Sequence, residues 1–367
     1  MNILIIAGEV SGDLYASKLA TALKENNPTC TIYGIGGQKL KSNCDHFIFE
    51  SAYSHGIGLS QQFHKKKFKK NLLTSIYNTI STTSITKAII IDFQHYNTLI
   101  AKTLQQKSIQ IHTFITPNFW MWKAHKQAAK IKQYSHHIFT IFKKEYDFYK
   151  KDHNNVYYFG HPLSELCQPP KKVPHKNKLL ITFFPGSRKQ EFDLYLSKMI
   201  KSIKPISILY PEAEFQISVS AKQFENKITK VLKKYKPPKT TITHCPTKEL
   251  LNKTDILISA SGSATLEAIL YNIPLLVLAA LPPITYFFAR YIIRVNLNYI
   301  ALPNFLVNQD IIPELVQHKI TVQNIVKKLS HLINNKENIL KKYTIVKDNI
   351  SKKPNIFDNI AKKIITS

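Results

Sequence analysis

Short apolar runs that alternate with helical patterns constrain the fold of this chain more than any other feature of its sequence. A strand followed by a helix and then by another strand gives parallel β-strands with helices packed against the sheet, so we expect an α/β fold. The expected strands are 2–7, 31–35, 87–92, 110–115, 137–142, 155–159, 178–184, 213–219, 239–243, 255–259 and 274–279. The expected helices are 14–25, 98–107, 124–133, 189–204, 222–235, 247–252 and 263–271, with further helices from 320 onward.

One stretch divides this pattern in two. The chain has 367 residues, more than a single core usually supports. The segment "CQPPKKVPHKNK", residues 167–178, has three prolines, five basic residues and no apolar period, which is typical of a linker. The sequence therefore predicts two Rossmann-like domains, at 1–166 and 179–345, joined by this linker. The remaining residues, 346–367, are expected to form a C-terminal helix that packs on the first domain or on a partner subunit.

Basic residues outnumber acidic residues by 51 to 23, which gives a formal net charge of +28. Such a charge favours a polyanionic partner: a nucleic acid, an anionic membrane or a phosphorylated substrate. Because the chain is rich in Lys, Ile and Asn throughout, compositional bias is the alternative explanation. The stretch nearest to a membrane span, residues 273–295, is interrupted by Pro282, Pro283, Arg290 and Arg294, so we expect no span.

The four cysteines are scattered and form no C-x-x-C pair, which is typical of a reducing compartment and predicts no structural zinc. The first residues run directly into a strand pattern. We therefore expect no signal peptide, since a basic segment followed by an apolar one is missing there.

Two turns in the second half of the chain have the features of an anion-binding site. In "FFPGSRKQE", Arg188 is one of only three arginines and follows a Pro-Gly-Ser turn. Backbone N–H groups at such a turn and a forked guanidinium both bind phosphate. In "ISASGSATLEA", a Ser-Gly-Ser-Ala turn at 261–264 opens a helix, and Glu267 lies where a carboxylate could bind a ribose diol. Together the two turns predict a nucleoside diphosphate donor, and a serine-capped helix is the alternative at each.

The turns in the first half of the chain are acidic instead. "GEVSGD" places Glu9, Ser11 and Asp13 after the first expected strand, and "AIIIDFQHYN" places Asp92 at the end of another. Carboxylates at the carboxyl edge of a sheet suit hydroxyls, amines or a proton to be removed better than they suit phosphate. Asp92 is therefore the candidate general base, and capping of the next helix is the alternative.

Aromatic residues mark two further segments. Trp120 and Trp122 lie in "PNFWMWKAHK", which predicts either an apolar floor for a sugar or acyl chain or a packed cluster beneath a loop. In "HKKKFKK", residues 64–70, five lysines surround one phenylalanine. This pattern is typical of a solvated helix face, and beside a lipid-handling site it would anchor the protein at a membrane surface.

In their order and spacing, nine short motifs resemble those of the lipid-A-disaccharide synthase family. The motifs are "AGEVSGD", "GIGG", "HGIG", "IDFQHYN", "PNFWMWK", "FGHPLSE", "PGSRKQE", "SASGSATLEA" and "LPNFLVNQ". The resemblance implies a GT-B glycosyltransferase, with two Rossmann-like domains facing across a cleft. It implies transfer of 2,3-diacylglucosamine from UDP-2,3-diacylglucosamine to 2,3-diacylglucosamine 1-phosphate (lipid X), which gives the β-1′,6-linked lipid A disaccharide 1-phosphate and UDP.

The same resemblance implies that the protein is cytoplasmic, peripheral on the anionic inner-membrane surface, and without metal or cofactor. Its expected partners are UDP-diacylglucosamine and lipid X but no nucleic acid, and a homodimer is left open.

The resemblance also assigns roles to individual residues. Asp92 is expected to be the catalytic base. The UDP moiety is expected to bind at Gly186, Ser187, Arg188, Ser261, Gly262, Ser263, Ala264, Glu267 and Asn304. The acceptor side is expected to include Gly8, Glu9, Ser11, Gly12, Asp13, His95, Asn97, Trp120 and Trp122.

At four positions the chain departs from the family pattern. Leu59 replaces the Glu of Met-Gly-Ile-x-Glu, Gln94 and His95 replace the Pro and second Asp of Asp-Ala-Pro-Asp-Phe-Asn, and Lys123 replaces an Arg. All four lie in the acceptor half, so the main alternative is another UDP-sugar enzyme with a changed acceptor, or an epimerase. A nucleic-acid-binding protein is a weaker alternative because the lysines are spread over both halves. A dinucleotide oxidoreductase is weaker still, because "GEVSGD" stands in place of G-x-G-x-x-G.

Overall fold

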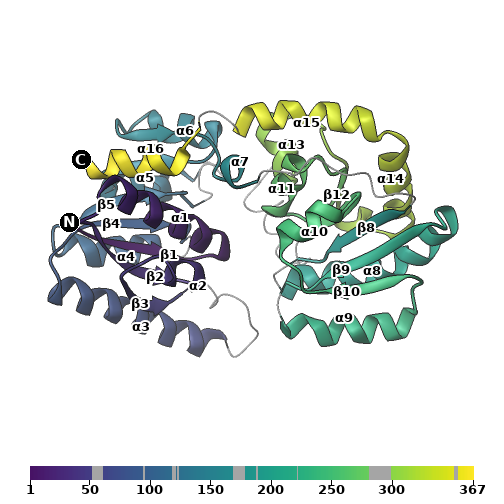
Figure 1. Ribbon diagram of the computed structural model, residues 1–367, viewed down its shortest axis with the longest axis horizontal. Helices are drawn as coiled ribbons and strands as arrows, with labels where there is room; N and C mark the ends of the chain where they lie inside the picture. Colours follow the sequence, from purple (N-terminus) through teal and green to yellow (C-terminus); the bar gives the residue numbers. More distant parts are fainter. Residues whose placement is uncertain are drawn as a thin grey trace. The chain divides into compact units, whose positions relative to one another are not determined.

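The computed structural model describes residues 1–51, 61–93, 96–117, 121, 124–167, 178–186, 189–220, 222–280, 299–350 and 354–367. The chain divides into two compact units: unit 1 is Met1–Glu165 with Ile350–Ser367, and unit 2 is Leu166–Asn349. Each unit is a parallel sheet with helices on both faces, which confirms the expected α/β class (Figure 1). Most of the predicted linker, residues 168–177, lies outside the described residues.

Unit 1 is built on a seven-stranded sheet in the order β3-β2-β1-β4-β5-β6-β7. The strands are β1 (Asn2–Ala7), β2 (Thr31–Gly36), β3 (His46–Glu50), β4 (Ile85–Ile91), β5 (Gln110–Phe114), β6 (His137–Thr140) and β7 (Val156–Tyr158). The residues of β1 from Ile3 to Ala7 are all buried, as expected for a central parallel strand. The chain order reverses between β1 and β4, and ligands of open α/β sheets bind beyond the carboxyl ends of strands at such a point.

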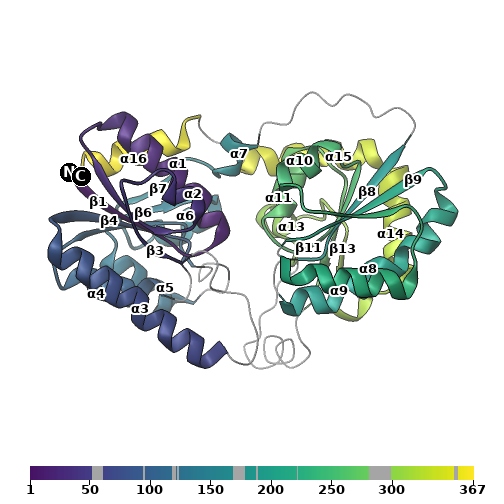
Figure 2. The same cartoon turned by 60° about the horizontal axis from the view of Figure 1, so that its bottom comes forward.

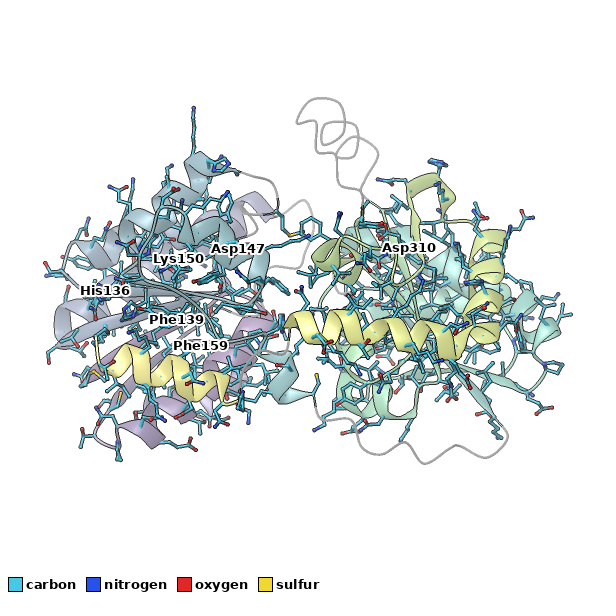
Figure 3. The ribbon with its side chains drawn as sticks, turned by 90° about the horizontal axis from the view of Figure 1, so that it is seen from above. His136, Phe139, Asp147, Lys150, Phe159 and Asp310 are labelled. Atoms are coloured by element: carbon cyan, nitrogen blue, oxygen red, sulfur yellow. The ribbon has the colours of Figure 1, made fainter. Side chains whose placement is uncertain are left out.

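Helices cover both faces of the unit 1 sheet. They are α1 (Val10–Asn26), α2 (Gln38–Lys41), α3 (Gln61–Thr82), α4 (Asn97–Gln105), α5 (His125–Tyr134), α6 (Lys143–Lys150), α7 (Leu163–Leu166) and α16 (Ile356–Ile365). Figure 2 shows α3, α4 and α5 on one face and α1 and α16 on the other. The Phe357 ring on α16 lies 6.4 Å from the rings of Tyr15 and Phe114, so the last helix packs into the core of unit 1. Phe139 and Phe159, labelled in Figure 3, stack with their ring centres 6.5 Å apart.

Unit 2 is built on a six-stranded sheet in the order β10-β9-β8-β11-β12-β13. The strands are β8 (Leu179–Phe184), β9 (Ala213–Ser218), β10 (Thr240–Thr243), β11 (Ile256–Ala260), β12 (Leu275–Ala279) and β13 (Glu314–Val316). The helices are α8 (Lys189–Leu209), α9 (Lys222–Tyr235), α10 (Thr247–Lys253), α11 (Ala264–Leu270), α13 (Leu302–Val307), the 3-10 turn η3 (Gln317–Lys319), α14 (Val322–Asn334) and α15 (Lys336–Ile350). Here the order reverses between β8 and β11, so the corresponding edge lies beyond Phe184 and Ala260.

The structure differs from the sequence-based expectation mainly in short or polar elements. β3 and β13 were not expected: β3 is an edge strand with exposed ends, and β13 has only three residues. The helices α2, α6, α7 and α13, and α3 beyond the basic segment 64–70, were not expected either. α1 begins at Val10 rather than at residue 14, because Ser11, Gly12 and Asp13 form its first turn. Among the described residues, no helix has both the length and the apolar character that crossing a bilayer requires.

Candidate functional site

The carboxyl edge of β1 and β4 brings together the two acidic motifs of unit 1, "GEVSGD" and "AIIIDFQHYN". The Gly8 N–H donates to the Ile91 carbonyl at 3.2 Å. A Cβ on Gly8 would lie 2.2 Å from Cδ2 of Phe93, and one on Gly12 would lie 3.4 Å from Cβ of Asp92. Glycine is therefore needed at position 8, because only a residue without a side chain lets the segment after β4 approach so closely.

Asp92 lies at the centre of this edge. The Ser11 hydroxyl donates to Oδ2 of Asp92 at 3.2 Å, and the Asp92 N–H donates to the Phe114 carbonyl at 3.2 Å. The backbone of Asp92 is left-handed, with φ 43°. The side chain is half-buried, and Glu9 is half-buried at the N-cap position of α1. This arrangement holds one carboxylate in a fixed place beside the first turn of a helix, as a general base requires.

Two residues predicted for the acceptor side, Asp13 and Asn97, are buried in unit 1. Asp13 is 1% exposed, and its carboxylate accepts from the N–H groups of Gly37 at 2.7 Å and of Lys39 and Leu40 at 3.1 Å. It therefore caps α2 and orders the "GIGG" turn. Asn97 is 2% exposed and lies beside the Tyr134 hydroxyl, inside the helical layer. Asp13 is thus engaged within the fold, because a polar side chain near the end of a strand can turn inward to satisfy backbone groups. The acceptor-side roles of Asp13 and Asn97 stay predictions.

A buried carboxylate in unit 1 was not found from the sequence. Glu145 on α6 accepts hydrogen bonds from the Thr116 hydroxyl at 2.6 Å and from the Ile141 N–H at 2.9 Å. Burial raises the pKa of Glu145 to about 7, although these hydrogen bonds favour the ionised form. The sequence pattern around it, "FKKEYDFYKK", is that of an ordinary charged helix and contains no signal of burial.

In unit 2 two of the predicted donor turns follow β8 and β11. Gly186 has φ 107°, a conformation that favours glycine, and its carbonyl accepts from the Ser220 hydroxyl at 2.9 Å. Gly262 and Ser263 are exposed, and no atom of the described residues, apart from Gly262 and its chain neighbours, lies within 4 Å of the place where a Cβ on Gly262 would be. The Ser261–Ala264 turn is thus open to a ligand, as a phosphate-binding turn must be.

Glu267 lies one turn further along α11, half-buried, near two groups that the sequence did not connect with it. Burial, reinforced by the negative charge of Glu267, raises the pKa of the Cys167 thiol to about 12. Burial and the charges of Cys167 and Glu267 also raise the pKa of the Tyr271 hydroxyl to about 12. Cys167 and Tyr271 therefore flank the candidate ribose-binding carboxylate in their neutral forms.

Asn304, also predicted for the donor, is 0% exposed. Its Oδ1 accepts from the N–H groups of Ile311 and Ile312 at 2.9 Å, and its Nδ2 donates to the Ile312 carbonyl at 2.8 Å. The amide is thus bonded to its own loop, and the contact of Asn304 with UDP stays a prediction. Other predicted site residues lie outside the described residues: His95, Trp120, Trp122, Ser187 and Arg188.

Solved structures similar to this chain share its fold at low sequence identity. A UDP-N-acetylglucosamine 2-epimerase from Listeria monocytogenes matches with a TM-score of 0.69 at 11% identity, covering 100% of this chain and 94% of its own. The UDP-GlcNAc 2-epimerase from Neisseria meningitidis bound to UDP-GlcNAc matches with a TM-score of 0.64 at 13% identity, covering 100% of both chains. MurG from Acinetobacter baumannii matches with a TM-score of 0.58 at 12% identity, covering 100% and 99%. These neighbours confirm a fold shared by GT-B glycosyltransferases and epimerases.

Sequence relatives are more specific. Lipid-A-disaccharide synthase from Coxiella burnetii is 26% identical over 344 residues, which cover 91% of this chain and 89% of the relative. The enzyme of the same name from Synechocystis is 28% identical over 343 residues, covering 89% and 86%. The family model described as lipid-A-disaccharide synthetase matches residues 3–366. The resemblance expected from the nine motifs is confirmed, and the chain belongs to the lipid-A-disaccharide synthase family of glycosyltransferases.

Proposed function

We propose that this protein transfers 2,3-diacylglucosamine from UDP-2,3-diacylglucosamine to lipid X, which yields lipid A disaccharide 1-phosphate and UDP. The family match across residues 3–366 carries this proposal. The left-handed turn at Gly186 and the exposed Gly262 turn in unit 2 support it, as does the Asp92 carboxylate of unit 1, which accepts a hydrogen bond from Ser11. The departures at Leu59, Gln94, His95 and Lys123 concern the acceptor, so the acceptor is the part of the proposal that most needs a test.

Asp92 is the proposed base. The acceptor hydroxyl gives its proton to the Asp92 carboxylate as its oxygen bonds to the anomeric carbon of the donor sugar. The bond from that carbon to the phosphate oxygen breaks, and the electron pair leaves with UDP. The hydrogen bond from Ser11 and the rigid end of β4 support this role, because a base must be held within reach of the proton it removes.

Arg188, Ser187 and Glu267 are the proposed donor ligands beside the two open turns. Arg188 is one of three arginines in a chain with 48 lysines, a choice that suits bidentate binding of a diphosphate. Glu267 suits the ribose hydroxyls. The epimerase from Neisseria meningitidis, which shares the fold, was solved bound to UDP-GlcNAc, and this supports a UDP-sugar as the ligand class.

We also propose that the protein binds an anionic inner-membrane surface through α3. Lys66, Lys67, Lys69 and Lys70 are exposed. Phe68 is half-buried, and its ring lies 5.6 Å from the rings of Phe49 and Tyr96, so it belongs to the fold. The proposed attraction is therefore electrostatic, without insertion of Phe68 into lipid.

The direct test incubates the purified chain with UDP-2,3-diacylglucosamine and lipid X and measures the products by mass spectrometry. The expected products are the disaccharide 1-phosphate and an equal amount of UDP. Release of UDP only when a different acyl-sugar acceptor replaces lipid X would identify a changed acceptor. Conversion of the donor sugar without transfer would identify an epimerase and overturn the proposal.

A further inference from the structure

Glu145 ties together the ends of two neighbouring strands in unit 1. It is 1% exposed, and each carboxylate oxygen serves a different strand. Oε1 accepts from the Thr116 N–H at 3.1 Å and from the Thr116 hydroxyl at 2.6 Å, just after β5. Oε2 accepts from the Ile141 N–H at 2.9 Å, just after β6. Because a buried carboxylate is costly, it persists only where such bonds fix it in place.

Backbone hydrogen bonds link the strand ends that Glu145 binds to the backbone of Asp92. The Ile115 N–H donates to the Phe139 carbonyl at 3.0 Å, and the Asp92 N–H donates to the Phe114 carbonyl at 3.2 Å. The segment that follows β5 is thus bound at Thr116 by Glu145, and two residues earlier the Phe114 carbonyl holds the backbone of Asp92. Only Ile115 separates Phe114 from Thr116.

Both residues at these exits have unusual backbone conformations. Asp92 has φ 43° and Ile115 has φ 63°. Left-handed geometry is rare outside glycine and is a genuine outlier for a β-branched residue such as isoleucine. Such conformations persist where the surrounding bonds over-determine them, often beside a functional site.

We propose that Glu145 is a positioning residue for Asp92: by binding Thr116 and Ile141 it holds the left-handed exit of β5, and through Phe114 it places the base. This inference rests on the proposed function, in which Asp92 removes the proton of the acceptor. Glu145 does not touch substrate in this scheme.

The hydrogen bonds explain why the residue must be a carboxylate. All the groups around its oxygens are donors, and a carboxylate is an acceptor at both oxygens. Glutamine has nearly the same shape but carries an NH₂ group at one position. Glu145→Gln would therefore leave one strand end facing a donor, without creating a cavity.

The test compares Glu145→Gln with Asp147→Asn, a change of the same kind at an exposed position on the same helix (Figure 3). We expect kcat for sugar transfer to fall by about 10²-fold in Glu145→Gln, because a small displacement of a catalytic group has a cost of that order. The KM for the UDP-sugar should stay within twofold, since the donor residues belong to unit 2. Asp147→Asn should behave as wild type.

A second pair of variants separates positioning from general stability. Thr116→Val removes the hydroxyl that donates to Glu145 but keeps the shape, and Thr116→Ser keeps the hydroxyl. We expect kcat to fall in the valine variant and to recover in the serine variant. The valine and serine variants also decide the question if Glu145→Gln does not fold.

Hydrogen exchange at the Asp92 and Ile115 amides gives a readout that does not need activity. Faster exchange in Glu145→Gln than in Asp147→Asn supports the link between Glu145 and Asp92. A kcat equal to that of Asp147→Asn in folded Glu145→Gln, or equal kcat in the Thr116→Val and Thr116→Ser variants, would overturn the proposal. If wild type transfers no sugar to lipid X, the proposed function fails, and unchanged amide exchange in Glu145→Gln would separately refute the positioning role.

Discussion

The carboxyl edges of the two parallel sheets differ in the residues that follow their strands: a carboxylate and a branched residue in unit 1, and glycines in unit 2. In unit 1 the exits of β4 and β5 turn left-handed at Asp92 and Ile115, and a buried carboxylate, Glu145, holds the second exit. In unit 2 the corresponding exits lie at Gly186, with φ 107°, and at Gly262, which has open space where a Cβ would be. The unit 1 edge holds the proposed base in one place, whereas the unit 2 edge leaves backbone accessible at the proposed donor turns.

The two units also differ in where they keep titratable groups. Burial in unit 1 lowers the pKa of His112 to about 2, with the positive charges of His137 and Lys87 adding to the effect. Burial likewise lowers the pKa of His137 to about 4 and of His161 to about 3. In the described part of unit 2 the histidines are all exposed: His244, His318 and His331. The stability of unit 1 therefore depends on buried imidazoles that stay neutral, whereas the described part of unit 2 has no buried imidazole.

The largest expected effect comes from Asp92→Asn, which should lower the rate of sugar transfer without changing UDP binding. A positioned base contributes about 10²–10⁴-fold to rate, so Asp92→Asn should lower kcat by that factor. UDP affinity, measured by calorimetry, should be unchanged because the donor residues lie in unit 2. The matched variant is His95→Ala: an active Asp92→Asn enzyme together with an inactive His95→Ala enzyme would move the role of base to His95.

The converse substitution, Arg188→Lys, should weaken UDP binding by unit 2 and leave the proposed base of unit 1 unchanged. Arg188→Lys keeps the charge but loses the planar fork, which costs about 1.5–3 kcal/mol of binding. We expect UDP to bind roughly 10- to 150-fold more weakly by calorimetry. The control is Arg294→Lys, outside both turns, which should bind UDP as wild type does. Equal UDP affinity in the Arg188 and Arg294 variants would remove Arg188 from the site.

Acid should destabilise unit 1 selectively. A histidine whose folded pKa is depressed contributes stability above its unfolded value of about 6.5, and that stability is lost as the pH falls. Between pH 6.5 and 5 the loss is about 2 kcal/mol for each imidazole that stays neutral in the folded state, such as His112 or His161. Glu145 opposes this loss, because its raised pKa favours the folded state as it protonates below about 7.

Urea unfolding followed by tryptophan fluorescence measures this effect, because Trp120 and Trp122 both belong to unit 1. His112→Leu should reduce the loss of stability on acidification, since neither ring nitrogen of His112 has a hydrogen-bond partner among the described residues. His331→Leu, at an exposed position in unit 2, should not change it. An acid loss in His112→Leu as large as in wild type would contradict the explanation.

The smallest expected effect concerns the surface lysines of each unit. One variant replaces five lysines of α3 by Gln: Lys65, Lys66, Lys67, Lys69 and Lys70. We expect this variant to sediment less with anionic vesicles than wild type does. Added salt should weaken wild-type binding, because charges are screened over about 8 Å at physiological ionic strength. The control replaces five exposed lysines of α9 by Gln: Lys222, Lys227, Lys230, Lys233 and Lys234. If both variants lose vesicle binding equally, net charge explains it, and α3 is only a solvated face.

The sequence by itself determined the parallel α/β class and the family. Apolar runs such as "NILIIA" report burial on both faces of a strand, and this information is local to each run. The positions of Gly8, Asp92 and Gly186 at strand ends could be predicted for the same reason, because a strand end and its turn residues are neighbours in the chain. Short edge elements such as β3 and β13 were missed, since so few residues carry too little pattern.

Only the tertiary structure decided which polar residues are buried within the fold and which stay accessible. Asp13, Asn97 and Asn304 carry the same kinds of side chain as the proposed site residues, yet each is buried. Asp13 and Asn304 bond to backbone groups that lie 24 or more and 7 or 8 residues away, respectively. Glu145 stands in a charged stretch that shows no sign of burial, and its partner Thr116 is 29 residues distant. The direction of a polar side chain depends on hydrogen-bonding groups that meet only when distant strands pair, and no local pattern contains that information.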